Sequence, residues 1–249
     1  VLWWHENLYR NPHPAGGNGR RNTAHCRGEF IALCEGDDYW IDPLKLQKQV
    51  DVMRKHPNVG IVAGECIQYE MPTGQFSSVL GVLPDGIISK EKAFLWLLYG
   101  MNPKVSERQN VHTSTLLLRA TVLKKTHELY SDLLSWILML GDYSICLAMT
   151  SISDLYCLKE PVSIYRHGSG GVTTYPISAT KVLRDGRIVA FYFARVVLGH
   201  EYRDIPSYVV DAWIVAVVSL MGHSSVARGR QVSFIETLGQ IDGFREVIF

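Results

Sequence analysis

The sequence lacks any strong excess of charge, and this limits the partners that we expect. Lysine and arginine number 25 against 24 aspartate and glutamate residues, so the 249-residue chain has a formal net charge of +1 at pH 7. Nucleic acids and anionic membranes attract proteins through a broad positive field, which a balanced chain does not provide. We therefore expect no nucleic-acid partner, and any recognition of phosphate must be local.

Cysteine is scarce and forms no recognisable framework. The five cysteines are odd in number and show none of the paired spacings that hold metal ions: Cys26, Cys34, Cys66, Cys146 and Cys157. Cys34 falls inside an apolar run that we expect to be a buried strand. A reducing compartment is the simplest account of this pattern, so we expect a cytoplasmic protein.

A long apolar run is missing as well. The longest one extends from Tyr208 to Gly222 and is interrupted by Asp211, whereas a membrane-spanning helix needs about 20 residues. We therefore expect a buried helix at this position. It belongs to a helical carboxyl-terminal region, for which packing, acceptor binding and peripheral association with the inner face of the membrane all stay open as roles.

Three carboxylates lie close together directly after a short apolar run. The run Phe30–Cys34 has the length of a buried strand and is bounded by glycines. Glu35, Asp37 and Asp38 follow within four positions. Clustered carboxylates repel one another unless a cation lies among them, and oxygen ligands of this type suit Mg²⁺ or Mn²⁺. The alternative is a solvated acidic turn without a ligand.

An amphipathic helix is expected after the acidic residues. Asp42-Pro43 has the form of a helix start, with an N-cap acceptor followed by proline at the first helical position. Lys45 then falls on the polar face, and the helix should end near His56-Pro57. Three apolar residues share the opposite face: Leu46, Val50 and Met53. The order of strand, acidic loop and helix places the carboxylates at the carboxyl end of a strand, where open α/β sheets bind ligands.

The rest of the chain alternates between strand and helix patterns. Strands are predicted for 59–69, 76–80, 155–158 and 162–165, and helices for 89–99 and 143–149, with Asp142 as the N-cap of the second. His112 precedes an apolar segment that ends at Arg119. A lone histidine is more often structural than functional, so His112 is a weaker site candidate.

Two glycine-containing segments could contact phosphate. Gly16–Ala24 contains the pair Arg20 and Arg21, and Tyr165–Val172 contains Arg166 and His167 before a glycine-rich stretch. Glycine allows close approach of the backbone, and arginine suits a diphosphate. Ordinary glycine turns are the alternative for both segments.

Taken together, the segments resemble a family 2 glycosyltransferase of the GT-A fold. Five of them carry the resemblance: Asn18–Asn22, Gly28–Trp40, Pro43–Val50, Gly141–Tyr143 and Tyr165–Val172. Glu35–Asp38 is similar to the acidic metal motif of that family, the DXD motif, usually written Asp-x-Asp-Asp. Gly141–Tyr143 falls where such enzymes carry the acidic residue taken as catalytic base. Tyr165–Val172 is similar to the segment Tyr-Arg-x-His-x-Gly-Gly that closes their catalytic domain.

The resemblance implies a fold and a set of roles. The fold is α/β, a GT-A-like (Rossmann-like) mixed sheet flanked by helices, with a catalytic domain over residues 1–175 and a helical region over 176–249. Asp142 is the implied catalytic base, and Asp37 and Asp38 are the implied ligands of Mg²⁺ or Mn²⁺. The implied donor-binding residues are Asn18, Gly19, Arg21, Glu35, Asp38, Arg166 and His167.

The chain also departs from the family pattern. Glu35 replaces the usual aspartate, Gly141 replaces a frequent glutamate, and His167 falls one position earlier than in the commoner spacing. The family normally opens with a strand, a helix and a second strand that holds the nucleotide. Residues before Asn18 do not supply this unit, so we expect an amino-terminally truncated domain whose own activity is in doubt.

The leading hypothesis is a glycosyltransferase. It would move a sugar from a nucleotide-diphosphate sugar to a hydroxyl of a saccharide or lipid-linked acceptor, as in polysaccharide biosynthesis, and the resemblance implies a metal-dependent, inverting reaction. One alternative is a non-catalytic nucleotide-sugar-binding domain or decayed glycosyltransferase fragment. A metal-dependent nucleotidyltransferase or phosphohydrolase is a third reading, but it does not explain Tyr165–Val172.

Overall fold

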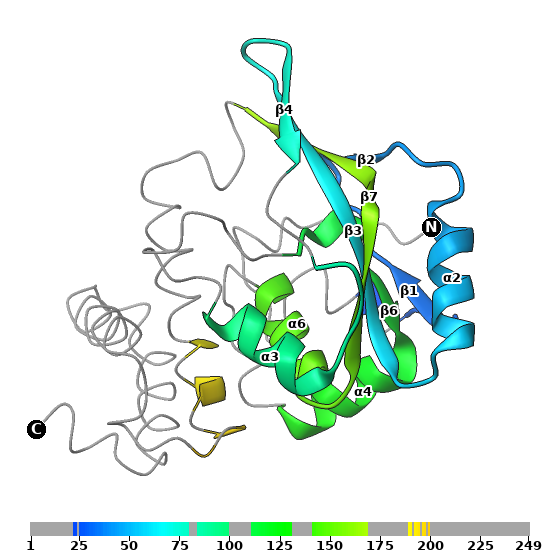
Figure 1. The fold of residues 1–249 in the computed structure, drawn as a ribbon, viewed down its shortest axis with the longest axis vertical. Helices are drawn as coiled ribbons and strands as arrows, with labels where there is room; N and C mark the ends of the chain where they lie inside the picture. The colour runs from blue at the N-terminus through cyan, green and yellow to red at the C-terminus, as the bar shows by residue number, and fades with distance from the viewer. Residues whose placement is uncertain are drawn as a thin grey trace, which may run out of the picture. The chain divides into compact units, whose positions relative to one another are not determined.

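The chain forms two compact units, Val1–Tyr175 and Pro176–Phe249. The computed structural model describes residues 22–23, 25–79, 84–99, 111–130, 141–168, 189–190, 192–194, 196–197 and 199. Within the first unit, strands and helices alternate along the chain, and Figure 1 shows helices against both faces of a twisted sheet. The predicted α/β class, a mixed sheet flanked by helices, is confirmed.

Seven strands and five helices of the first unit are described. The strands are β1 (Phe30–Ala32), β2 (Tyr39–Trp40), β3 (Val59–Glu70), β4 (Gln75–Val79), β5 (Gly86–Ile88), β6 (Leu117–Arg119) and β7 (Asp154–His167). The helices are α2 (Lys45–Lys55), α3 (Lys90–Tyr99), the 3₁₀-helix η1 (Thr113–Thr115), α4 (Ala120–Leu129) and α6 (Gly141–Thr150).

The sheet is mixed because one strand pair is parallel and the others are antiparallel. Its order is β1-β6-β3-β7-β2, with β4 paired to β3 and β5 paired to β7. Only β3 and β7 run parallel among the described pairs. Since β6 is antiparallel to both β1 and β3, the strands β1, β3 and β7 all point the same way, and their carboxyl ends lie at one edge.

That edge collects segments from distant parts of the sequence. The acidic loop leaves the carboxyl end of β1, and Glu70 and His167 end β3 and β7 side by side. Because β6 runs the opposite way, the turn η1 that precedes it arrives at the same edge. A hydrogen bond of 3.1 Å from Leu33 N to Leu116 O joins the start of the acidic loop to the end of η1.

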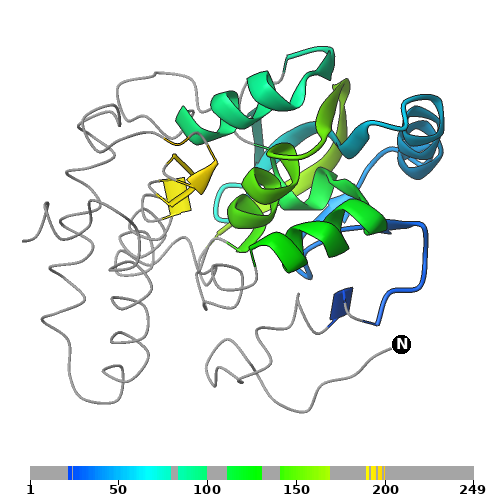
Figure 2. The same cartoon turned by 90° about the horizontal axis from the view of Figure 1, so that it is seen from below.

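Apolar side chains fill both faces of the central strand β3. On one face, Met53 of α2 packs with Val59, Val62 and Leu117. The other face lies against α3, α4 and α6, and Figure 2 shows these three helices gathered together. Ile61 and Ala63 are fully buried, as expected for a strand covered on both sides.

Local sequence signals predicted most of these elements correctly. Strand 59–69 appears as β3, the returning strand 76–80 as β4, and the helix after Ser89 as α3. Arg119 ends β6 and is the N-cap residue of α4. The apolar run Phe30–Cys34 is only partly a strand, because β1 stops at Ala32 and Cys34 is exposed.

Helix α2 differs from its prediction at its start and on its buried face. It begins at Lys45, because the Asp42 side chain accepts a hydrogen bond of 2.8 Å from Leu44 N and holds the preceding residues in a turn. The end near His56 is confirmed. The buried residues are Lys45, Gln49 and Met53, whereas Leu46 is 39% exposed. Lys45, which hydrophobicity alone assigned to the polar face, therefore lies on the buried face of the helix.

Strand β7 replaces two predicted short strands. It continues through Pro161, where the register with β3 shifts opposite Gly64 and Glu65. An irregularity of this kind accommodates a proline without ending the strand. At Gly64 an added Cβ would lie 2.6 Å from a methyl of Val162, so the close contact between β3 and β7 at this position requires glycine.

The second unit is described at only a few positions. Residues 189–190, 192–194 and 196 are helical, within the helical region predicted over 176–249. Val189 and Phe193 are buried, and Gly199 has a φ of +62°, the left-handed geometry expected just after a helix. The buried helix predicted at Tyr208–Gly222 lies outside the described residues.

Two sequence-based expectations concern membranes and thiols. All five cysteines are free thiols, and Cys66, Cys146 and Cys157 are buried. In the part of the chain that is described, no helix has the length and apolar character needed to span a membrane.

Candidate active site

One buried serine, Ser114, forms hydrogen bonds that hold the acidic loop in place. Ser114 donates its hydroxyl hydrogen to Asp38 Oδ2 at 2.6 Å and accepts a hydrogen bond from Glu35 N at 3.1 Å. The indole Nε1 of Trp40 donates to Ser114 O at 2.9 Å. One residue of η1 therefore holds both ends of the loop that carries the predicted metal motif.

Asp38 joins this loop to the end of β7. Its side chain is fully buried, and its Oδ1 accepts a hydrogen bond of 3.1 Å from Arg166 N. The guanidinium of Arg166 in turn donates to the backbone carbonyl of Asp37. Residues 128 positions apart in the sequence are thus in direct contact, and both were predicted to lie in the donor site.

Asp142 lies in the first turn of α6 and faces η1. Helix α6 begins at Gly141, so Asp142 lies within its first turn, and the prediction that Asp142 is the N-cap is wrong. Its Oδ1 accepts a hydrogen bond of 2.8 Å from Tyr143 N, and its Oδ2 accepts one of 2.7 Å from Thr113 Oγ1. Thr113 and Ser114 are adjacent, so Asp142 and Asp38 are held by neighbouring residues.

The environment of Glu35 raises its pKa. The protein packed around Glu35 raises its pKa to about 7, and the charges of Asp142, Asp38 and Asp37 add to this effect in that order. The predicted base therefore lies within electrostatic range of the predicted metal motif.

His112 lies in the middle of this cluster. Its ring packs on Tyr165 with centroids 4.6 Å apart, and its Nδ1 is 3.8 Å from Asp38 Oδ2. That nitrogen is buried and forms no hydrogen bond within the described part of the chain. Burial lowers the pKa of His112, while the charges of Asp38, Asp142 and Asp37 oppose that change.

His167 is paired with a glutamate that the sequence analysis did not identify. Its Nδ1 lies 2.9 Å from Glu70 Oε2, and Gln68 Nε2 donates to the other carboxylate oxygen of Glu70. The histidine partner lowers the pKa of Glu70. The rings of His167 and Tyr165 have centroids 6.1 Å apart, so His167 continues the row that starts at His112.

The structure thus brings together six predicted site residues: Glu35, Asp37, Asp38, Asp142, Arg166 and His167. The predicted donor-binding residues Asn18, Gly19 and Arg21 lie outside the described residues. Sequence reasoning missed Thr113, Ser114 and Glu70. The available signal was weak, namely a run of hydroxyl residues just before a strand and an acidic residue at the end of another.

A divalent cation fits this site only if its ligands come partly from a substrate. Among the residues described, no three His, Cys, Asp or Glu side chains converge to hold a metal ion. Asp38 already accepts one hydrogen bond at each oxygen, whereas Asp37 is exposed in a loop with surplus negative charge. Mg²⁺ is commonly bound by one or two carboxylates plus substrate phosphates. The residues therefore fit an ion held by Asp37, with Asp38 beside it, and completed by a diphosphate.

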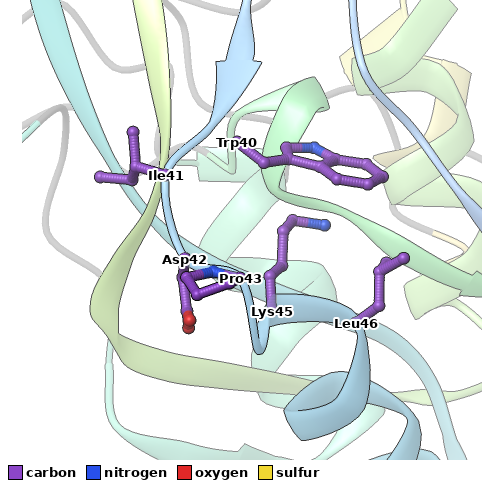
Figure 3. Close-up of a pocket in the computed structure, with 6 residues that line it drawn as sticks. All are labelled: Trp40, Ile41, Asp42, Pro43, Lys45 and Leu46. Carbon is purple, nitrogen blue, oxygen red and sulfur yellow. The ribbon is translucent and has the colours of Figure 1, made fainter.

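A separate pocket lies on the other side of Trp40. It has a volume of ≈ 300 Å³ and is lined by Trp40, Ile41, Asp42, Pro43, Lys45 and Leu46. Figure 3 shows the Lys45 side chain extending from α2 toward the indole ring, and Lys45 Nζ lies 4.4 Å from the ring centroid. None of the six predicted site residues lines this pocket.

Comparisons with known proteins give distant matches. No family model matches the chain. Uncharacterized proteins of Mycobacterium bovis and of two strains of Mycobacterium tuberculosis are 27% identical over 199 residues, which cover 76% of this chain and 51% of each of theirs. The chain therefore spans about half the length of the curated relatives it matches.

Two solved structures of S. aureus TarS, residues 1–349, also match. The structure in complex with UDP-GlcNAc has a TM-score of 0.45 at 12% identity and covers 81% of this chain and 59% of that one. The other has a TM-score of 0.44 at 12% identity and covers 82% and 59%.

Proposed function

We propose that this protein transfers a sugar from a nucleotide-diphosphate sugar to an acceptor hydroxyl. The observation that carries the proposal is the convergence of three distant segments at one edge of the sheet. The acidic loop, Asp142 and the Arg166–His167 pair are the segments that resemble a family 2 glycosyltransferase, and hydrogen bonds link the first to Ser114 and Arg166. The carboxyl edge of an α/β sheet is also where such proteins bind ligands.

Each part of the site has a role in this reaction. Asp142 accepts the proton of the acceptor hydroxyl. The acceptor oxygen forms a bond to the anomeric carbon while the bond from that carbon to the diphosphate oxygen breaks, and its electron pair leaves with the diphosphate. Arg166 and His167 stabilise the charge on this leaving group. The resemblance implies a single displacement, and therefore inversion at the anomeric carbon.

Asp37, together with Asp38, would hold Mg²⁺ or Mn²⁺ beside the donor. When bound, such an ion acts as a Lewis acid that neutralises charge on the leaving diphosphate. Glu35 lies on this side of the site, where the surrounding protein and the neighbouring carboxylates raise its pKa. A saccharide or lipid-linked acceptor would approach from the side of Asp142.

Donor turnover tests the proposal. The protein is incubated with a panel of UDP-sugars and GDP-sugars plus Mn²⁺, and release of the nucleotide diphosphate is measured. We expect turnover that is abolished by EDTA and by Asp37→Ala. Asp51→Ala is the matched control, because Asp51 is an exposed carboxylate of α2 that only accepts a hydrogen bond from Gln47. Turnover that survives both EDTA and Asp37→Ala would overturn the metal assignment.

Asp142→Asn tests the base separately. Asparagine keeps the size of the side chain and can still accept a hydrogen bond from Thr113. Loss of a general base commonly lowers turnover by about 10²–10⁴-fold, and we expect binding of UDP with Mn²⁺ to stay nearly unchanged. An equal loss of binding and turnover would assign Asp142 a structural role in the start of α6.

A non-catalytic nucleotide-sugar-binding domain is the second candidate. One observation favours it: Gly141 opens α6 where the resembling enzymes frequently carry a glutamate, so this site has one carboxylate fewer. Binding of UDP or GDP discriminates poorly between the two candidates, since both predict it. Turnover across the donor panel discriminates well.

A further inference from the structure

Two hydroxyl groups of the short helix η1 donate hydrogen bonds to two carboxylates of the proposed site, those of Asp142 and Asp38. Thr113 Oγ1 donates to Asp142 Oδ2 at 2.7 Å, and Ser114 Oγ donates to Asp38 Oδ2 at 2.6 Å. Asp142 is the proposed base, and Asp38 belongs to the proposed donor loop. Two consecutive residues therefore set the positions of the two halves of the site relative to each other.

The turn itself is held firmly from several sides. Thr115 N and Thr115 Oγ1 both donate to His112 O, at 2.9 Å and 2.7 Å. Gln49 Nε2 donates to Thr115 O at 2.7 Å, and Trp40 Nε1 donates to Ser114 O. Ser114 and Thr115 are fully buried. A support that is bonded to α2 and β2 in this way can fix a carboxylate more precisely than a free loop.

Thr113 matters for Asp142 because Asp142 has little other support. Its Oδ1 accepts a hydrogen bond from Tyr143 N, the next residue of its own helix. Among the described residues, Thr113 supplies the hydrogen bond to Asp142 that comes from a different element. Without it, the carboxylate keeps one partner and can rotate about its terminal torsion, which is broad for aspartate.

We propose that Thr113 is a positioning residue that aims Asp142 at the acceptor hydroxyl, while Ser114 positions the donor-binding loop through Asp38. This inference rests on the proposed function, since it assigns a task to the same site. It predicts that neighbouring hydroxyls of one turn affect different steps. Removing the first changes turnover, and removing the second changes binding of the nucleotide diphosphate.

Four variants separate these effects. Thr113→Val keeps the shape of the side chain and removes the hydroxyl, and Thr113→Ser restores it. Ser114→Ala removes the hydroxyl that holds Asp38. Thr115→Val is the matched control, because it loses a hydrogen bond of the same length from the same turn without touching a carboxylate, and Thr115 N still donates to His112 O. Binding is measured by calorimetry with UDP or GDP plus Mn²⁺, turnover with the donor panel, and folding by thermal melting.

The expected pattern is a split between the two measurements. Misplacing a catalytic group by about 1 Å can cost about 10²-fold, so we expect Thr113→Val to lower turnover by about 10–100-fold with the dissociation constant of the diphosphate unchanged. Thr113→Ser should recover most of the lost turnover. Ser114→Ala should weaken binding of the diphosphate, and Thr115→Val should leave both quantities near the wild-type values.

Several outcomes would overturn the inference. Full turnover in Thr113→Val, with Asp142→Asn inactive, refutes the positioning role alone and leaves the proposed function intact. An equal loss in Thr113→Val and Thr115→Val shows that the turn only supports the fold. Thr113→Ala carries the same test if Thr113→Val does not fold. A wild-type protein that turns over no donor in the panel overturns the proposed function, and this inference with it.

Discussion

The buried pair of Lys45 and Gln49 permits a quantitative test of how the fold supports the site. Lys45 Nζ donates to Gln49 Oε1 at 2.8 Å, and the two residues are 1% and 0% exposed. Gln49 Nε2 donates to Thr115 O at 2.7 Å and to Val62 O at 3.2 Å. Gln49 therefore connects a buried ammonium group to β3 and to the turn that holds the two carboxylates.

Replacing Gln49 by leucine should destabilise the fold strongly. The substitution removes the hydrogen-bond acceptor of a buried ammonium and the donor to two buried carbonyls. Each buried polar group left without a partner costs about 1–3 kcal/mol, and a charged group costs more. Overlap between these effects leads us to expect a free energy of unfolding lowered by about 4 kcal/mol. At roughly 2–4 °C per kcal/mol, the melting temperature falls by roughly 8–16 °C.

A second substitution should recover part of this loss. Lys45→Met in the Gln49→Leu background removes the unpaired charge and fills the same space with an apolar chain. Replacing a buried polar pair by apolar residues of similar volume is often neutral or stabilising. We therefore expect the double variant to be about 2 kcal/mol more stable than Gln49→Leu, which is a large coupling energy for two residues in contact.

The pH dependence gives an independent check of the same reasoning. Burial lowers the pKa of Lys45 from its ordinary value of 10.5 to about 8. Between these values the unfolded chain binds a proton that the folded chain does not, so wild-type stability rises as the pH rises from 8 toward 10.5. The rise cannot exceed about 3.4 kcal/mol, at 1.36 kcal/mol for each unit of pKa. Lys45→Met should remove this rise, and the deficit of Gln49→Leu should shrink at high pH.

Urea unfolding followed by circular dichroism, at pH 7 and pH 10, measures all of these quantities. Gln47→Leu is the matched control, because Gln47 is an exposed glutamine on the same helix. Surface substitutions usually change stability by less than about 0.5 kcal/mol. Additive effects of Lys45→Met and Gln49→Leu would refute the argument. So would a Gln49→Leu deficit that is the same at both pH values.

Two further substitutions test the packing of the sheet. Gly64→Ala should lower the free energy of unfolding by about 1–3 kcal/mol, because the added Cβ would lie 2.6 Å from a Val162 methyl and neither strand can move freely. The urea midpoint measures this change, and a wild-type midpoint would contradict the prediction. Arg119→Met should lower the free energy of unfolding by about 2 kcal/mol, because Arg119 donates to Met53 O at 2.7 Å and to Val59 O at 2.9 Å. An unchanged urea midpoint in this variant would contradict the prediction.

Elements with a strong local signal could be predicted from the sequence. Examples are the β-branched residues of β3 and the serine before α3. These signals, like the order of the motifs, can be recognised along the chain without knowledge of tertiary contacts. For the same reason, the acidic residues after β1 could be assigned to the carboxyl end of a strand. The resemblance then indicated which distant segments belong to the same site.

The missed features depend on tertiary contacts. Lysine is a charged residue, so hydrophobic periodicity assigns Lys45 to solvent. Its burial depends on its contacts with Gln49 and Trp40, which a periodicity pattern cannot reveal. The roles of Thr113 and Ser114 depend on partners 29 and 76 positions away. The two predicted strands that form β7 were separated because a proline usually marks a boundary, whereas the shifted register with β3 absorbs it.

The environment of Glu35 disfavours its charged form in the folded protein, and this argues for a function that uses the carboxylates of the site. Burial and the charges of Asp142, Asp38 and Asp37 raise the pKa of Glu35. Within the described part of the chain, neither Glu35 nor Asp37 has a basic side chain within ion-pair distance. A scaffold without a ligand would gain stability by replacing one of these groups with an amide, because removing one like charge relieves the others. Their presence together is simpler to explain if a cation and a diphosphate complete the site, and this favours the transferase over a decayed domain.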